Sequence, residues 1–344
     1  MPYAVTIDNL RKNYAGEHAL AGVSFSIAAG SLAGIIGADG AGKTTLMRIL
    51  ATLISADAGA ASVLSYDVNT QHRKIRAAIG YMPQKFSLYE DLTVWENLLF
   101  FADVFGVIGM ERQRRLDRLM AFSRLGQAQD RRAGRLSGGM KQKLALSCAL
   151  IHTPRLLILD EPTTGVDPVS RNEFWRILKD LQRDGITIIV STPYMDEAEY
   201  CDTVLLLHRG GVLMQSTPAQ AVERYPHALF RAESRAGTVR WPARAPAPRG
   251  ARFVYPSGGA LHVAADPQIV NEPALLEALR EVMPEIETLH RIGPRMNDVL
   301  FSCYNAAGSA GPESAPPPAP APGHAHNPLA MIRHAISQHR KGRP

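Results

Sequence analysis

The sequence predicts an α/β protein with a parallel sheet, a helical insertion, a smaller α+β domain and a disordered tail. Three observations carry this prediction. A glycine-rich loop joins an apolar strand at 32–36 to a helix-like run. A continuous apolar run at 156–159 is typical of a strand buried on both faces of a parallel sheet, and 187–191 is predicted to be another buried strand. Alanine, proline, glycine and serine dominate from residue 305 onward, which is typical of an unfolded spacer.

The glycine-rich loop is the centre of the sequence, and it fits the pattern G-x-x-x-x-G-K-[ST]. Its glycines let successive backbone N–H groups curl around a phosphate, and the helix that opens at Gly42 points its positive end at the same anion. Lys43 is expected to reach the outer phosphates, and Thr44 to hold Mg²⁺. The alternative, a plain glycine-rich turn, is disfavoured by the strand and helix on either side. The loop residues assigned to nucleotide binding are Gly37, Asp39, Gly40, Ala41, Gly42, Lys43, Thr44 and Thr45.

Before the loop, residues 3–12 and 21–28 are predicted to be strands, because apolar residues punctuate the first and alternate with small ones in the second. Tyr14 lies between them. Its ring is a candidate for stacking on the adenine of a bound nucleotide, and the alternative is an ordinary amphipathic loop side chain.

After the loop, short strands are predicted near 63–66 and at 79–84, the second ending at Gln84. From about 86 to 147 the apolar residues recur at helical spacing, which predicts a helical insertion in the α/β domain. Arginines at 112, 114, 115 and 118 favour a solvated helix face over an anion site.

Two further motifs follow. Ser137 is a predicted N-cap, and Gly138 and Gly139 would let a nucleotide approach the N–H groups of the helix that begins there. The buried strand at 156–159 ends in Asp160 and Glu161, and open α/β sheets bind ligands at the carboxyl ends of their strands. Asp160 is suited to position the metal, and Glu161 to polarise a water that attacks the γ-phosphate. The alternative is an acidic strand end that caps the next helix. Glu161 and Lys43 are the predicted catalytic residues.

The order of these motifs over residues 3 to about 222 resembles the nucleotide-binding subunit of ABC transporters. The resemblance rests on the phosphate loop, Gln84, the 136–139 motif, the 159–161 strand end, 165–167 and 191–198. It implies ATP as ligand and Mg²⁺ held with the help of Thr44, Gln84 and Asp160. It also implies that Gln84 senses the metal and γ-phosphate and signals to a membrane partner, that Ser137 and Gly139 act on nucleotide held by the opposite subunit, and that Asp167 lies at the dimer interface.

Residues 80–94, together with 37–40, look closer to one subgroup: the first ATPase half of tandem drug-efflux ATPases that work with ABC-2-type membrane subunits. The resemblance implies an ATP-binding motor subunit of a drug or multidrug exporter. Its expected partners are an ABC-2-type transmembrane subunit, a second ATPase subunit in a homodimer or heterodimer, and a membrane-fusion protein. A soluble ABC ATPase acting on ribosomes, DNA or cluster assembly is the alternative. Such proteins usually carry two ATPase halves or a long coiled-coil insertion, and neither is seen here.

Two departures from the family pattern stand out. Met140 replaces the usual glutamine of the signature. Pro193 replaces the switch histidine, and proline has neither a side-chain donor nor a backbone N–H. An active phosphoryl-transfer site needs a γ-phosphate donor at that point, so a catalytically weakened nucleotide-binding half is a further interpretation.

Charge, cysteine content and the lengths of apolar runs limit the possible partners and location of the protein. The net charge of +6 is spread out rather than gathered into a run, so no nucleic-acid partner is expected. Three widely separated cysteines form neither a disulfide framework nor a metal-ligand spacing. No apolar run is long enough to cross a bilayer, and the N-terminus lacks a charged head followed by an apolar core. These features predict a cytoplasmic protein whose membrane role depends on a partner, and the resemblance implies a peripheral position on the cytoplasmic face of the inner (plasma) membrane.

The expected domains are 1–222, the nucleotide-binding domain; 223–304, an accessory α+β domain; and 305–344, a disordered tail. The accessory domain is predicted from a hairpin over 252–263 and a helix at 272–282, with 298–301 as its family-like ending and no catalytic constellation. In the tail, scattered histidines suggest a metal tract, which their irregular spacing disfavours. Residues 327–343 could form a short basic helix, but a solvated tail is preferred.

Overall fold

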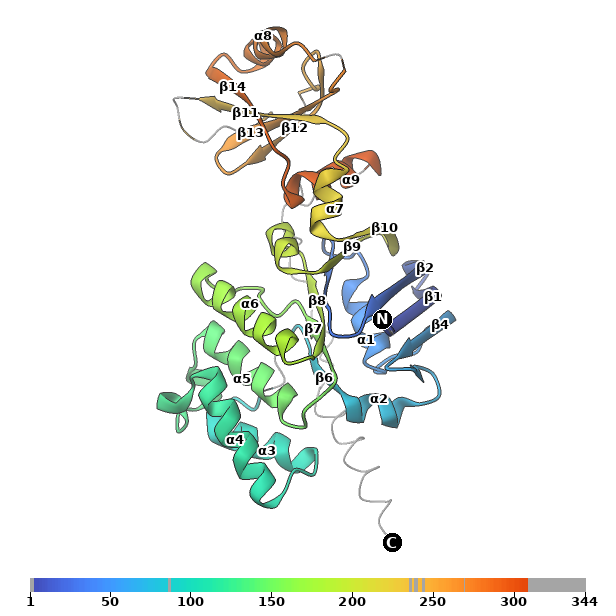
Figure 1. Ribbon diagram of the computed structural model, residues 1–344, viewed down its shortest axis with the longest axis vertical. Coiled ribbons are helices and arrows are strands. Elements are labelled where there is room, and N and C mark those ends of the chain that lie inside the picture. Colours follow the sequence, from blue (N-terminus) through green and yellow to red (C-terminus); the bar gives the residue numbers. More distant parts are fainter. Residues whose placement is uncertain are drawn as a thin grey trace. The chain divides into compact units, whose positions relative to one another are not determined.

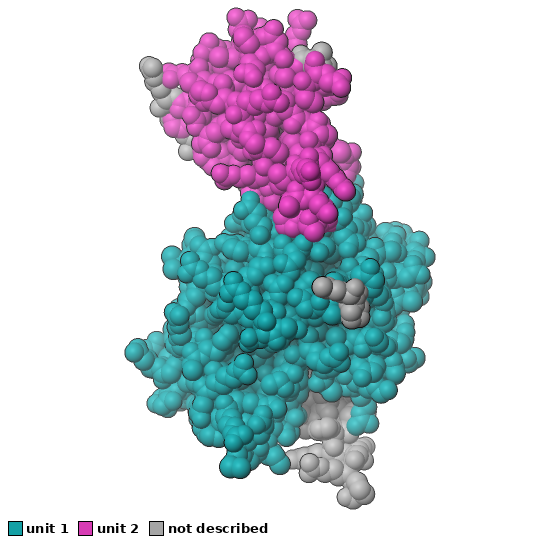
Figure 2. All heavy atoms as spheres, viewed as in Figure 1, with its two compact units in different colours: residues 1–215, 318–344 teal, residues 216–317 magenta. Residues whose placement is uncertain are grey.

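The computed structural model describes residues 3–85, 88–234, 237, 241–242, 245–268 and 270–308. Its contacts divide the chain after Gln215 into two compact units, coloured separately in Figure 2. The predicted tail at 305–344 lies outside the described residues from 309 onward. None of the described helices is long and apolar enough to span a membrane.

Unit 1 is built around a six-stranded sheet in the order β10-β9-β3-β8-β7-β6. The strands are β3 (Leu32–Ile36), β6 (Ile79–Met82), β7 (Leu156–Asp160), β8 (Thr187–Thr192), β9 (Thr203–His208) and β10 (Gly211–Ser216). Strands β9, β3, β8, β7 and β6 pair in parallel. Every residue of β3, β7 and β8 is buried, as their apolar runs predict, because helices cover both faces of a parallel sheet. The predicted α/β fold is confirmed.

A second, antiparallel sheet has the order β2-β1-β4-β5, with β1 (Tyr3–Tyr14), β2 (Glu17–Ala28), β4 (Ala58–Val63) and β5 (Tyr66–Asp67). The single short strand predicted near 63–66 is instead two paired strands. Leu64 and Ser65 form the tight turn between them, with left-handed φ values of 51° and 67°. The sequence did not indicate this turn, because it contains neither glycine nor proline.

The helices of unit 1 are α1 (Lys43–Leu50), α2 (His72–Ala78), α3 (Val94–Val104), α4 (Gly109–Ser123), α5 (Gly138–Leu150) and α6 (Pro168–Arg183). Short 3₁₀ turns occur at Gly126–Ala128 (η1), Ala133–Arg135 (η2) and Met195–Tyr200 (η3). Figure 1 shows α3, α4, α5 and α6 gathered on one side of the parallel sheet, while α1 lies between that sheet and the antiparallel one. Thr93 and Glu96 form a reciprocal capping box that starts α3.

Unit 2 contains an antiparallel sheet in the order β12-β13-β11-β14. Its elements are α7 (Pro218–Glu223), β11 (Ala228–Ser234), β12 (Ala251–Ser257), β13 (Ala260–Ala265), α8 (Glu272–Val282), β14 (Ile286–Ile292) and α9 (Met296–Ala306). The predicted hairpin is β12 and β13, and the predicted helix is α8. Leu275 and Leu279 of α8 pack on the inner residues of β11 and β13, which closes a core of its own for this unit.

Candidate functional site

The candidate site lies where neighbouring strands of the parallel sheet end. Ile36 of β3 pairs with Thr192 of β8, and Asp160 of β7 pairs with Ser191. Because parallel strands finish at the same edge, the loop after β3, the carboxylates at the end of β7 and Gln84 after β6 come together. Residues far apart in sequence thus form one constellation.

The glycine-rich loop depends on missing side chains at Gly37 and Gly42. Gly42, the N-cap of α1, has φ of 103°, and a Cβ there would lie 2.3 Å from the carbonyl oxygen of Ala19. A Cβ on Gly37 would lie 2.4 Å from the carbonyl oxygen of Leu207. The backbone therefore passes between two neighbouring strands with no room for a larger residue, and its N–H groups remain available at the start of α1.

Lys43 is buried at the first position of α1, with 4% of its surface exposed. Its ammonium donates to the carbonyl oxygens of Gly37 and Ala38, at 2.8 and 3.1 Å. It also lies 3.1 Å from Oε1 of Glu161, whose exposure is 6%. A buried cation is held by the loop backbone on one side and by a carboxylate on the other, as burial of two charges requires.

Further hydrogen bonds hold Glu161 in place. Its Oε2 accepts from Nε2 of Gln84 at 2.8 Å. Its backbone N–H donates to the carbonyl and hydroxyl oxygens of Ser191, at 3.1 and 2.9 Å. Its φ of 48° is left-handed, which is uncommon for a residue other than glycine and recurs at functional sites. The carboxylate is therefore aimed at the ammonium of Lys43 and the amide of Gln84.

Asp160 is 1% exposed, and its Oδ1 accepts from the hydroxyls of Thr44 at 3.2 Å and Ser191 at 2.6 Å. Burial raises the pKa of Asp160 above its ordinary value, and the charge of Glu161 adds to the rise, while both hydroxyls oppose it. Its Oδ2 has no hydrogen-bond partner among the described residues. An orphaned carboxylate oxygen beside a threonine hydroxyl is the hard-oxygen donor set that Mg²⁺ prefers, so Thr44 and Asp160 fit this ion.

The 137–139 motif starts α5 as predicted. Oγ of Ser137 accepts from the N–H of Met140 at 3.4 Å. A Cβ on Gly139 would lie 2.6 Å from Oγ of Ser170 in α6, so these helix starts touch. Asp167 caps α6 by accepting from the N–H of Ser170 at 2.9 Å, and this hydrogen bond lowers the pKa of Asp167. Ser137 and Asp167 are both exposed on this part of unit 1.

Tyr14 is the last residue of β1, not a loop residue between two strands. Its ring is 46% exposed, and the ammonium of Lys12 lies 5.6 Å from its centroid. The following strand, β2, passes the loop at Ala19, beside Gly42. The role of Tyr14 in adenine stacking stays a prediction.

Two buried polar residues near the site were not indicated by the sequence motifs. Gln142 and Glu197 are both 0% exposed, and both contact the residues that follow Glu161. Each sits inside or beside a recognised motif, but its burial depends on packing between distant elements. No sequence pattern reveals that.

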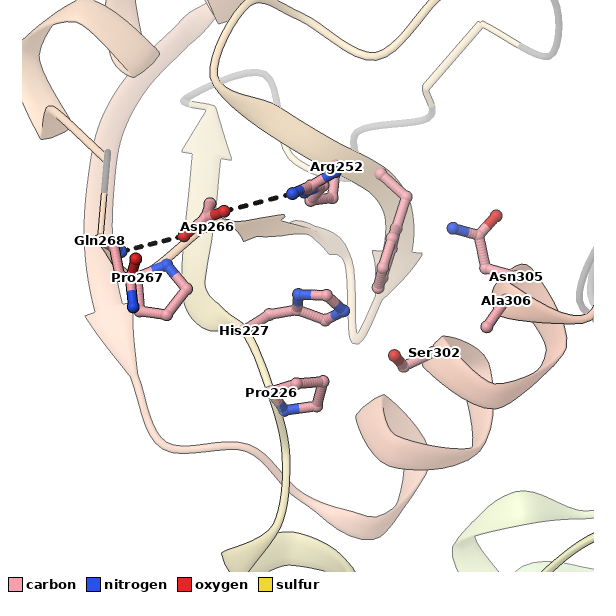
Figure 3. A pocket seen from close by; sticks show the side chains of 10 residues that line it. Pro226, His227, Arg252, Asp266, Pro267, Gln268, Ser302, Asn305 and Ala306 are labelled. Atoms are coloured by element: carbon pink, nitrogen blue, oxygen red, sulfur yellow. Dashed lines mark hydrogen bonds and ion pairs between the residues drawn. The ribbon is translucent and has the colours of Figure 1, made fainter.

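Unit 2 has a pocket of about 470 Å³, shown in Figure 3, between α9 and the ends of β12 and β13. The guanidinium of Arg252 is paired with Asp266 at 3.2 Å, so the two charges offset each other. Burial lowers the pKa of His227, the charge of Arg252 lowers it further, and the charge of Asp266 opposes the fall. The pocket lacks the glycine loop and adjacent carboxylates of the site in unit 1.

Comparison with known proteins identifies the family. Residues 20–164, which hold the loop, Gln84, the 137–139 motif and the 160–161 carboxylates, match the family described as ABC transporter. The probable multidrug ABC transporter ATP-binding protein YbhF of Escherichia coli is 40% identical over 311 residues, or 89% of this chain and 53% of that protein. The Nod factor export ATP-binding protein I of Rhizobium sp. is 39% identical over 223 residues, or 64% of this chain and 73% of that protein. The chain thus spans about half the length of its E. coli relative.

Solved structures agree. The chain is similar to cbiO1 of Clostridium perfringens, part of an ABC transporter complex, with a TM-score of 0.61 and 29% identity over 65% of this chain and 92% of that one. It is also similar to a dimeric ATP-binding cassette in a post-hydrolysis state with ADP and Pi, with a TM-score of 0.57 and 27% identity over 62% of this chain and 98% of that one. The chain belongs to the ATP-binding proteins of the ABC transporter family.

Proposed function

We propose that this chain is the ATP-binding motor subunit of an ABC-2-type exporter of drugs or other small molecules, and that it couples ATP binding and hydrolysis to a separate membrane subunit. The observation that carries the proposal is the convergence of Lys43, Gln84, Asp160 and Glu161 at one edge of the parallel sheet. The names of its relatives, which specify multidrug transport and Nod factor export, support export over a soluble role on ribosomes or DNA.

In this proposal the loop N–H groups and Lys43 hold the phosphates of ATP. Lys43 exchanges its contacts with the loop carbonyls and Glu161 for phosphate oxygens, which releases Glu161 to orient the attacking water. Thr44, Asp160 and Gln84 are the residues that would hold Mg²⁺, and the ion would neutralise charge on the transferred phosphoryl group. Gln84 contacts Glu161 directly, so a change at the phosphates reaches the residues that precede α3.

We further propose a second ATPase subunit, identical or different, whose nucleotide contacts Ser137 and Gly139 of this chain. Support comes from the exposed position of Ser137 and Asp167 and from the dimeric state named for a solved relative. A membrane-fusion protein is a further partner, and the position is peripheral on the cytoplasmic face of the inner membrane. Residues 1–222 act as the motor, 223–304 as an accessory domain and 305–344 as a tail.

A second candidate function is a catalytically weakened half of an asymmetric ATPase pair. Pro193 offers no N–H, and the next N–H, of Tyr194, already donates to the hydroxyl of Thr192 at 3.0 Å. The two candidates are compatible, since a slow site can belong to a working transporter.

Calorimetric titration of the full chain with Mg-ATP tests the proposal. Lys43→Ala removes the main cationic partner of the phosphates, and we expect its Kd for ATP to rise at least about tenfold. Lys179→Ala is the matched control, because Lys179 is also ion-paired in unit 1, with Asp202, but on α6. Equal dissociation constants for wild type and Lys43→Ala would refute the nucleotide site.

A further inference from the structure

The residues directly after Glu161 are held from two sides. Pro162 and Thr163 are buried, and Thr163 is 0% exposed. From α5, Gln142 donates its Nε2 to the carbonyl oxygen of Pro162. From η3, Glu197 accepts the hydroxyl of Thr163 on its Oε1 at 2.8 Å. The 161–163 segment therefore lies between the helix that starts at Ser137 and the segment that follows Pro193.

Glu197 joins three elements through one carboxylate. Its Oε2 accepts from the hydroxyl of Thr192, the last residue of β8, at 2.5 Å. Its Oε1 lies 3.6 Å from Nε of Arg171 on α6, and the Arg171 guanidinium also stacks 4.1 Å from the centroid of the Tyr194 ring. A fully buried carboxylate is costly unless several donors satisfy it. Of these donors, Thr192 directly precedes Pro193 and Thr163 belongs to the 161–163 segment.

Packing alone would not favour a glutamine at position 142. It is 0% exposed, and its Oε1 has no hydrogen-bond partner in the part of the chain that the structure describes. Burying an unpaired amide oxygen is unfavourable, and a methionine of similar length would avoid this cost. What the glutamine adds is a donor to the carbonyl oxygen next to Glu161.

We infer that Gln142 and Glu197 are positioning residues that together fix the 161–163 segment, and so set where the Glu161 carboxylate points. This rests on the proposed ATPase function. Since Pro193 supplies no donor, the rate at this chain's own site depends on the placement of Glu161. Gln142 also links that placement to α5, so a movement of α5 when Ser137 meets a partner's nucleotide reaches Glu161 through one hydrogen bond.

Single-turnover hydrolysis with the full chain in excess over Mg-ATP tests the inference, because it measures slow chemistry. Thr163→Val removes the hydroxyl at nearly constant volume, and Gln142→Met removes the amide donor. Each is expected to lower the rate about tenfold, as a displaced catalytic group does, with the Kd for Mg-ATP within twofold of wild type. Thr163→Ser keeps the hydroxyl and should restore most of the rate.

Ser147→Ala is the matched control on α5. Ser147 is buried and donates to the carbonyl oxygen of Lys143 at 2.8 Å, so its loss removes a hydrogen bond on the same helix without touching the 161–163 segment. Rates equal to wild type in Thr163→Val and Gln142→Met, with a lowered Tm, would show a merely structural role and overturn the inference. So would an equal loss of rate in Ser147→Ala.

Hydrogen exchange decides the same question without turnover. The Glu161 N–H is bonded to Ser191, and the Val166 N–H to the carbonyl of Thr163. Both amides should exchange faster in Thr163→Val and Gln142→Met than in wild type or Ser147→Ala. Unchanged exchange would refute the claim that Gln142 and Glu197 fix the 161–163 segment. If wild type hydrolysed ATP no faster than Lys43→Ala, the proposed function would be wrong. Hydrogen exchange of the two amides would still test the positioning role, because it needs no ATP hydrolysis.

Discussion

At the scale of single residues, Gly42 shows how a missing side chain shapes the site. Its φ of 103° is unfavourable for any larger residue. An added Cβ would also clash with the carbonyl oxygen of Ala19, at 2.3 Å. We expect Gly42→Ala to lower Tm and to abolish ATP binding, since the loop backbone must move.

The control for this prediction is Gly30→Ala. Gly30 has a similar φ of 72°, but a Cβ there would meet nothing within 4 Å. It should therefore cost only the left-handed strain of about 1–2 kcal/mol and leave ATP affinity unchanged. Scanning calorimetry and ATP titration of both variants measure the difference, and equal losses of Tm would contradict the steric argument.

At the scale of elements, Asp298 shows how α9 is attached to the sheet of unit 2. It is 1% exposed, and its Oδ1 accepts from the hydroxyl of Tyr255 at 2.5 Å and from Nδ1 of His262 at 2.7 Å. Its Oδ2 accepts from the N–H of Arg295 at 2.6 Å, which starts the helix. One carboxylate thus bonds β12, β13 and the N-terminus of α9.

The ionisation of Asp298 gives a prediction on pH. Burial alone would raise the pKa of Asp298, but hydrogen bonds from His262, Tyr255 and the Arg295 N–H bring it below the ordinary 3.8. A carboxyl with a lowered folded pKa contributes stability that is present above the unfolded value and is lost as pH falls through the folded one. We therefore expect unit 2 to loosen in acid below pH 3.8, measured by hydrogen exchange of β12, β13 and α9.

Asp298→Asn should reproduce this loosening at neutral pH, at a cost of about 1–3 kcal/mol, because two buried donors lose a charged acceptor. Asp266→Asn in the same unit is the control. Its ion pair with Arg252 is more exposed and is screened by solvent, so its loss should destabilise unit 2 less than the loss of the Asp298 carboxylate. Equal effects of the two substitutions would show that the Asp298 bonds are not what hold α9.

The helical insertion carries the next prediction, that the membrane subunit docks on it near residues 86–95. Phe86 lies outside the described residues, but Leu88 and Trp95 are half-buried and Glu90 is exposed. A photo-crosslinker at Glu90 should capture the membrane subunit in the assembled transporter, and one at the exposed Glu285 of unit 2 should not. Crosslinks confined to unit 2 would contradict this.

These elements also show what the sequence could predict. Strands β3, β7 and β8 could be predicted from their apolar residues, and helix α8 from its helical spacing of leucines. The hairpin of β4 and β5 was missed because Leu64 and Ser65 take left-handed φ values that neither residue type announces. Gln142 and Glu197 were missed because their burial comes from contacts between α5, η3 and the end of β7, which only the tertiary fold brings together.

At the scale of the whole molecule, the chain would supply half of each of two nucleotide sites in the proposed dimer, and these two halves differ. One half is complete: Ser137 and Gly138 are exposed at the start of α5, as needed to reach nucleotide on another subunit, and the buried Gly139 packs beside Ser170 of α6. The other half lacks a donor, because Pro193 has no N–H and the N–H of Tyr194 is already bonded to Thr192. Loss of one transition-state donor costs roughly 10² to 10³ in turnover.

The last prediction follows from this asymmetry. A partner subunit with its own switch histidine would make one complete site with Ser137 and Gly139 of this chain, while the site on Lys43 would bind ATP and hydrolyse it slowly. We expect low ATPase activity from the chain alone and appreciable activity in the complex. Steady-state turnover of the complex should fall more in Ser137→Arg, which blocks the complete site, than in Glu161→Gln, which alters the slow one. If the purified chain alone turned over as fast as the full complex, Pro193 would be no handicap and the asymmetric arrangement would be wrong.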